Sequence, residues 1–251
     1  MMRPYREMTR ALSLSVARKP EAIFFTVAFA PLLVAVLGAI FGNEPQSDFG
    51  GQGFIEMQLP ALSGVVLAMM GVLTVPSDVV ALREQGSLRR LRATPLKPGA
   101  FIAADLTCHF AMGLVGLLLA LGCGAALFGL TPSGGAATIA RVTCLLVLGL
   151  VAFMALGYLL AALLPSLAVV TPVGNVLVMA LIMTSGVAIP LAVLSEGLRS
   201  VVERSPLTMF VKALQGLWQG EPLGEHVTAL GVLGVMAVAC GGAAVRLFRW
   251  E

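Results

Sequence analysis

The chain has 251 residues, of which 58% are hydrophobic and only 12% are charged, and its mean hydropathy is +0.96. A soluble domain carries about 25% charged residues, so this composition excludes a water-soluble globular protein and predicts a lipid environment. The net charge of +3 is spread over short basic clusters beside apolar runs, which argues against a nucleic-acid-binding surface.

Residues 1–20 predict an amphipathic helix lying on the membrane surface, because an apolar stripe at helical spacing alternates with arginines. The stripe consists of Tyr5, Met8, Leu12 and Val16. The apolar run from Ile23 to Phe41 is longer than the roughly 7–15 apolar residues of a signal peptide, and no small-x-small cleavage pattern follows it. We therefore interpret residues 21–41 as a retained first span.

Six apolar segments are long enough to cross a bilayer, which requires about 20 helical residues. The predicted spans are residues 21–41, 59–81, 101–129, 138–163, 168–189 and 224–245. Pro76 predicts a kink near the end of the second span. The sequence therefore predicts an all-α polytopic membrane protein with six transmembrane helices and a single domain.

The distribution of Lys and Arg predicts the orientation of these spans, since both accumulate on the cytoplasmic side. Basic residues precede the first span, fill the 83–97 loop and follow the last span, whereas the loops between the other spans carry most of the acidic residues. We expect both termini to be cytoplasmic, which agrees with an even number of spans.

Residues 83–96 form a basic, polar island between the second and third spans. Leu88 and Leu91 lie on one face of a predicted short helix and arginines lie on the other, and Pro95 and Pro98 are expected to end it. A short amphipathic helix on a cytoplasmic loop is typical of a docking element for a soluble partner.

Residues 190–222 do not predict a span, because they carry six charges. They contain two amphipathic stripes separated by Ser205 and Pro206. Ser205 is a candidate N-cap and Pro206 suits the first position of a helix. We predict two short external helices, interfacial or re-entrant in the outer leaflet.

The chain lacks the motifs of a catalytic or metal-binding protein. None of its lysines completes G-x-x-x-x-G-K-[ST], so we predict no phosphate-binding loop and no ATPase site in this chain. The four cysteines lie separately in apolar runs, which is typical of packing residues rather than a disulfide framework or metal site.

Ionisable residues within spans are candidates for function, and here they are Asp78, Asp105 and His109. Asp105 and His109 are four residues apart, so they share one helix face and can pair. Two readings remain open, a proton relay and an ion pair that is structural and lies near the cytoplasmic end of the third span.

Three stretches resemble the ABC-2 type transporter permeases, the membrane subunits of bacterial drug, lipid and polysaccharide exporters. Residues 84–96 (EQGSLRRLRATPL) resemble the family's E-x-G-T-L-x-x-L-x-A-T-P-L element, and residues 185–190 (SGVAIP) are similar to its S-G-x-x-x-P. Residues 205–208 (SPLT), followed by Ala213 and Leu214, are similar to N-P-L-T with a downstream A-L-R. The order of the three stretches extends the resemblance over essentially the whole chain.

The resemblance implies a role for each stretch. The residues expected to couple the chain to an ATPase are Glu84, Gly86, Ser87, Leu88, Arg89, Arg90, Leu91, Arg92, Thr94 and Pro95. Those expected at an external gate are Ser185, Gly186, Pro190, Pro206, Leu207 and Thr208. Candidate pathway residues are Phe24, Phe25, Phe29, Thr171, Asn175 and Thr184.

The chain departs from the family pattern at three positions. Ser87 replaces the usual Thr and keeps its hydroxyl, whereas Gln215 replaces an Arg and removes an external charge. Asp105 stands where a basic residue is common. The last two departures bear on the charge of the cargo and leave the expected fold unchanged.

By this resemblance the chain is expected to be a permease without enzymatic activity in the inner membrane of a bacterium. It would assemble with two copies of an ABC ATP-binding subunit, which would hold ATP-Mg, and with a second permease, identical or homologous. No cofactor or metal is expected in this chain, and its other contacts are with membrane lipids.

We expect the complex to export hydrophobic or amphiphilic compounds such as antibiotics. The alternatives are a lipid-linked glycan or lipid exporter of the same family, a stand-alone proton-coupled carrier that uses Asp105 and His109, and a non-transporting scaffold or sensor.

Overall fold

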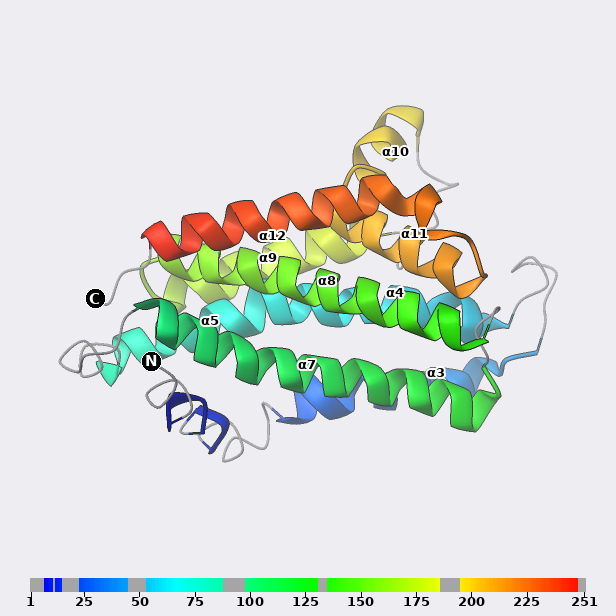
Figure 1. Ribbon diagram of the computed structural model, residues 1–251, viewed down its shortest axis with the longest axis horizontal. Helices are drawn as coiled ribbons and strands as arrows, with labels where there is room; N and C mark the ends of the chain where they lie inside the picture. Colours follow the sequence, from blue (N-terminus) through cyan, green and yellow to red (C-terminus); the bar gives the residue numbers. More distant parts are fainter. Residues whose placement is uncertain are drawn as a thin grey trace.

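The computed structural model describes residues 7–10, 12–14, 23–44, 53–87, 98–130, 135–185 and 195–247. Every regular element in these residues is a helix, and the long helices run side by side in one elongated bundle (Figure 1). The predicted all-α class is therefore confirmed.

Residues 7–10 and 12–14 are helical, and the rest of the predicted surface helix 1–20 lies outside the described residues. The remaining elements follow in chain order. They are η1 (Phe24–Ala28), α3 (Phe29–Phe41), α4 (Phe54–Met69), η3 (Met70–Thr74), α5 (Val75–Glu84), α7 (Pro98–Phe128), α8 (Gly135–Leu163), α9 (Leu167–Thr184), α10 (Glu196–Val202), α11 (Pro206–Trp218), η5 (Leu223–His226) and α12 (Val227–Leu247).

Five helical segments are long and apolar enough to cross a membrane, which confirms a polytopic membrane protein. They are Phe54–Glu84, Ala103–Phe128, Gly135–Leu163, Leu167–Thr184 and Leu223–Leu247. α3 is apolar but shorter, and it continues directly from the π-helical η1. The count of six spans stays a prediction.

α4, η3 and α5 form one continuous helix of 31 residues from Phe54 to Glu84. This helix begins before the expected residue 59. Its π turn, η3, ends two residues before Pro76, which has no N–H to donate to the preceding turn. A π turn at this point accommodates the interrupted hydrogen-bond ladder where a kink was expected.

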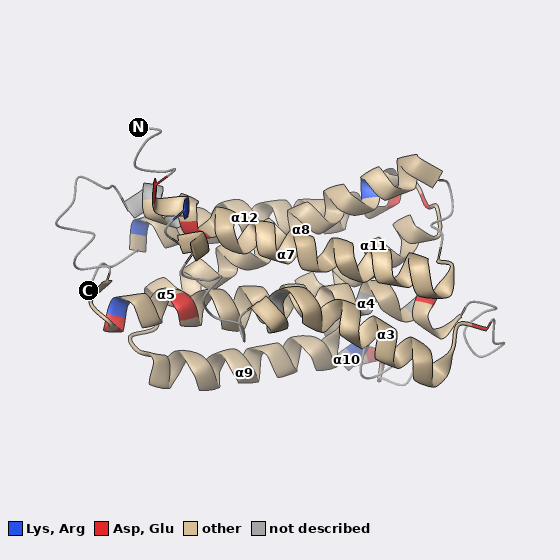
Figure 2. Cartoon of the chain, turned by 90° about the horizontal axis from the view of Figure 1, so that it is seen from below, with Lys and Arg blue, Asp and Glu red and all other residues tan. Residues whose placement is uncertain are grey.

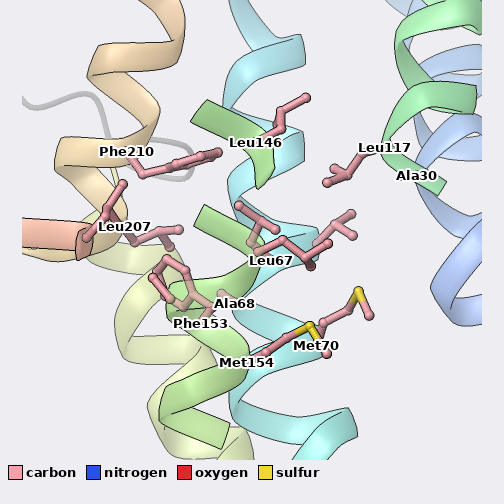
Figure 3. Packing of buried hydrophobic residues seen from close by; sticks show 14 of the residues in the cluster. Ala30, Leu67, Ala68, Met70, Leu117, Leu146, Phe153, Met154, Leu207 and Phe210 are labelled. Carbon is pink, nitrogen blue, oxygen red and sulfur yellow. The ribbon is translucent and has the colours of Figure 1, made fainter. Parts of the chain in front are cut away.

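The core lies where α4, α8 and α11 meet. Leu67, Phe153 and Phe210, one from each helix, are fully buried and belong to one hydrophobic cluster (Figure 3). Glycines let these helices approach closely. A Cβ added at Gly157 of α8 would overlap the carbonyl oxygen of Gly71 in η3, and one added at Gly71 would overlap the carbonyl of Phe153.

Charged residues in the described part of the chain gather toward the two ends of the bundle, and the length between them is mostly uncharged (Figure 2). At one end, which we call the loop end, α5 finishes and α7 begins, whereas α10 and α11 lie toward the opposite, far end (Figure 1). This distribution fits a bundle whose middle is surrounded by lipid.

Candidate functional site

The loop between α5 and α7 is the segment expected to couple the chain to an ATPase. α5 ends at Glu84, and a turn follows in which Gly86 has a φ of 69°, a left-handed conformation that suits glycine. Pro98, expected to end the loop helix, is instead the first residue of α7, where its missing N–H costs nothing. The candidate residues that lie outside the described part are Leu88, Arg89, Arg90, Leu91, Arg92, Thr94 and Pro95.

Arg83, in the last turn of α5, reaches across to the end of α8. Its guanidinium donates hydrogen bonds to the carbonyl oxygens of Ala161, at 3.1 Å, and Leu164, at 2.5 Å. The last carbonyls of a helix lack partners within that helix and carry partial negative charge. Arg83 therefore caps α8 from a neighbouring helix.

Glu84 caps the beginning of α9, whereas Arg83 caps the end of α8. Its Oε1 atom accepts a hydrogen bond of 2.8 Å from the backbone N–H of Leu167, the first residue of that helix. Ser166 occupies the N-cap position but makes no capping bond with its side chain. The carboxylate of Glu84 therefore satisfies one of the free N–H groups in the first turn of α9, at the positively polarised end of that helix.

Sequence reasoning included Glu84 among the candidate residues for its expected contact with a partner, and it missed Arg83. Both side chains have partners within the chain, on either side of the short turn between α8 and α9. No sequence signal names these partners, since they follow from how α5 packs on α8 and α9.

A second polar cluster joins α5, α7 and α8 near the same end. His109 Nε2 lies 3.2 Å from Asp78 Oδ2, and His109 Nδ1 lies 3.5 Å from Asp105 Oδ2. The Tyr158 hydroxyl donates a hydrogen bond to the same Asp105 oxygen. The side chains of His109 and Asp105 are only 4% exposed, whereas that of Asp78 is 28% exposed.

The pairing of Asp105 with His109 follows the predicted four-residue spacing, while Asp78 and Tyr158 complete the cluster from other helices. Asp78 lies within two turns of the end of α5, and Asp105 lies near the beginning of α7. No other Asp, Glu, Lys, Arg or His lies in the central part of the described spanning helices. The cluster therefore bridges helices at one end and does not extend as a chain of ionisable groups toward the far end.

The two predicted gate motifs meet where α9 ends and α11 begins. Thr208 donates a hydrogen bond of 2.6 Å to the carbonyl oxygen of Thr184, and Leu207 and Thr208 are fully buried. Ser185 is also buried, and its hydroxyl bonds to the carbonyl of Ile182. Pro206 is the first residue of α11, preceded by Ser205 at the N-cap without a side-chain bond. Gly186 and Pro190 lie outside the described residues.

The predicted pathway residues do not gather into one described cavity. Phe24, Thr171 and Asn175 are exposed, Phe29 and Thr184 are partly buried, and the side chain of Phe25 is outside the description. A cavity of about 330 Å³ lies between Thr9 and Ser13 on one side and η1 and α7 on the other. Its lining residues are Thr9, Ser13, Ile23, Val27, Thr107, Cys108, Ala111 and Met112.

The fold and the distribution of charge define a multi-pass α-helical membrane protein with a basic connecting loop at one end. Comparison with known families assigns the chain to a family, because the family model of the ABC-2 type transporter matches residues 5–217. The chain belongs to the ABC-2 type transporter family and is a membrane permease subunit of an ABC transporter. No curated protein matches the chain.

Proposed function

We propose that this permease is the membrane half of an ATP-driven exporter of hydrophobic or amphiphilic, antibiotic-like compounds in the cytoplasmic membrane of a bacterium. The observation that carries the proposal is that the helices on both sides of the basic loop are bonded to the rest of the bundle. α5 is bonded to α8 and α9 on one side of the loop, and α7 is bonded to α5 and α8 on the other. A loop attached in this way transmits force from a soluble partner to the spans.

The expected partner is an ABC ATP-binding subunit in two copies, which holds ATP-Mg, beside a second permease that is identical or homologous. Leu88 and Leu91 would anchor the loop in the ATPase, and Arg89, Arg90 and Arg92 would make the polar contacts. The loop end and both termini are then cytoplasmic, in agreement with the excess of Lys and Arg there. Closure of the ATPase dimer would push on the loop and change the free energy of the outward-open state.

The cargo class follows from the chemistry of the spanning helices. Their central parts hold no charged side chain in the described residues, while Thr171 and Asn175 supply exposed, weakly polar groups on α9. Such a surface favours hydrophobic or amphiphilic molecules over small ions. A lipid-linked glycan or lipid with an apolar tail is the alternative cargo of the same chemistry.

A second candidate function depends on the polar cluster of Asp78, Asp105, His109 and Tyr158. A proton-coupled carrier would use Asp105 and His109 to bind and release protons during transport. The restriction of the cluster to one end of the bundle favours the ATP-driven permease, because no further ionisable groups continue a relay through the described helices.

Transport into inside-out membrane vesicles separates these functions. With the chain in its native membrane, ATP is expected to drive accumulation of rhodamine 6G, a cationic amphiphile. A fluorescent phospholipid is measured in parallel, and its accumulation in place of rhodamine 6G would indicate a lipid exporter. Arg89→Glu with Arg90→Glu should abolish the ATP-driven accumulation, whereas Asp105→Asn should retain it if the protein folds. Accumulation driven by a proton gradient without ATP, and lost in Asp105→Asn, would contradict the proposal and support the carrier.

A further inference from the structure

Two neighbouring residues at the root of the coupling loop hold the turn between α8 and α9 from both sides. We infer that Arg83 and Glu84 form a clamp that passes the displacement of the loop to α9, and through α9 to α11 at the far end. This inference rests on the proposed function, and it assigns Arg83 and Glu84 as positioning residues.

The clamp has opposite charges on opposite helix ends. The Arg83 guanidinium bonds to two carbonyl oxygens at the end of α8, and the Glu84 carboxylate bonds to the first N–H of α9. All three hydrogen bonds are charge-assisted, and each charge faces the helix end of opposite polarity. Since only residues 164–166 separate the two helices, holding both ends fixes the turn relative to α5.

The clamp lies next to the segment on which a partner would act. Gln85, Gly86 and Ser87 are the only described residues between Glu84 and the loop residues 88–97. A displacement of the loop therefore reaches Arg83 and Glu84 before any other contact of α5 with the bundle. On the other side of the loop, α7 is held to α8 by the bond between Asp105 and Tyr158. The helices on both sides of the loop, α5 and α7, are thus bonded to α8 at the loop end of the bundle.

α9 is suited to carry this displacement because it is held at its two ends. Between them Gly174 and Val178 are buried, with Gly174 packed against η3, and other side chains are exposed. Val176 and Met179, in its middle, are 69% and 62% exposed. At the far end, the carbonyl of Thr184 accepts the hydrogen bond from Thr208 of α11. α9 has 18 residues, so it spans about 27 Å between these two attachments.

The local step of the inference is tested on the full-length chain alone by hydrogen exchange of the backbone amides in residues 164–170. Glu84→Ala should accelerate exchange in this segment about tenfold, as expected for loss of a charge-assisted hydrogen bond. Glu84→Gln keeps an acceptor oxygen for Leu167 and should restore most of the protection. Unchanged exchange in Glu84→Ala would overturn the clamp.

Transmission is tested in the complex with its ATPase, in a variant that lacks the four native cysteines and carries an environment-sensitive fluorophore on Met183→Cys near the far end of α9. ATP-Mg with vanadate should shift the emission in the parent complex. Arg83→Ala, which leaves the residues expected to contact the ATPase unchanged, should keep ATP hydrolysis and lose the shift. Arg204→Ala, which removes the same charge at an exposed position of the far end, should keep both.

The outcomes separate the inference from the function on which it rests. A full shift in the Arg83→Ala complex would overturn transmission through the clamp while leaving an ATP-driven permease intact. A parent chain that shows protected amides in residues 164–170 but binds no ATPase would instead overturn the proposed function, and transmission with it.

Discussion

Asp105 brings a carboxylate into the apolar part of α7, where it is buried beside His109 and Tyr158. A buried charge is tolerated when it is paired and hydrogen-bonded, and here the partners come from α7 itself and from α8. The four-residue spacing of Asp105 and His109 predicted the first contact. The second could not be predicted, because it depends on how α8 is rotated about its axis.

We expect Tyr158→Phe to lower the free energy of unfolding by about 1–3 kcal/mol, since it removes the hydroxyl that donates to buried Asp105. Thermal unfolding of the purified chain in detergent, followed by tryptophan fluorescence, measures the change. Thr107→Val removes an exposed hydroxyl from α7, the helix that carries Asp105, and should change stability by less than about 0.5 kcal/mol. Equal stabilities for both variants would show that the cluster does not depend on Tyr158.

Glu203, just after α10, shows a small electrostatic effect at the far end. Hydrogen bonds from Arg199 and Lys212 lower the pKa of Glu203 below its ordinary value of 4.5. A carboxylate with a lowered pKa stabilises the fold above pH 4.5, and this contribution is lost as the pH falls through the folded-state pKa. Glu203→Gln should therefore reduce the acid-side loss of stability, measured by thermal unfolding between pH 6 and 3, while an identical pH profile would contradict this.

Among the elements, η3 and α8 cross at close range. Small residues recur at four-residue spacing along α7, at Gly116, Ala120 and Gly124, and these residues are buried. The tightest backbone contact lies instead at Gly71 and Gly157. The π turn before Pro76 places Gly71 against α8, and helical periodicity contains no signal for such a turn.

Gly157→Ala is expected to destabilise the bundle by about 1–3 kcal/mol, because the added methyl group meets a backbone carbonyl that cannot rotate away. Gly122→Ala is the matched control, since nothing lies within 4 Å of a Cβ at that position in α7. Alanine favours a helix over glycine, so the control should be neutral or slightly stabilising. Detergent unfolding of the two variants decides, and a tolerated Gly157→Ala would contradict the described crossing.

For the whole molecule, composition and hydropathy were sufficient to predict the all-α membrane class. The motifs in residues 84–96, 185–190 and 205–208 were sufficient to predict the family, and the match of the family model to residues 5–217 confirms it. The site was predicted less completely. Position in the sequence identified the loop and Glu84, but the contacts of Arg83 and Glu84 with the turn between α8 and α9 depend on tertiary packing.

The central claim, that a separate ATPase drives this permease through its basic loop, is tested most directly by purifying the tagged chain from its native membrane in mild detergent. We predict a stoichiometric P-loop ATPase with ATP hydrolysis, both lost in Leu88→Asp with Leu91→Asp and both kept in Val201→Asp, an exposed position of α10. A chain that purifies alone and without ATP hydrolysis, under conditions that preserve other membrane complexes, would contradict the account.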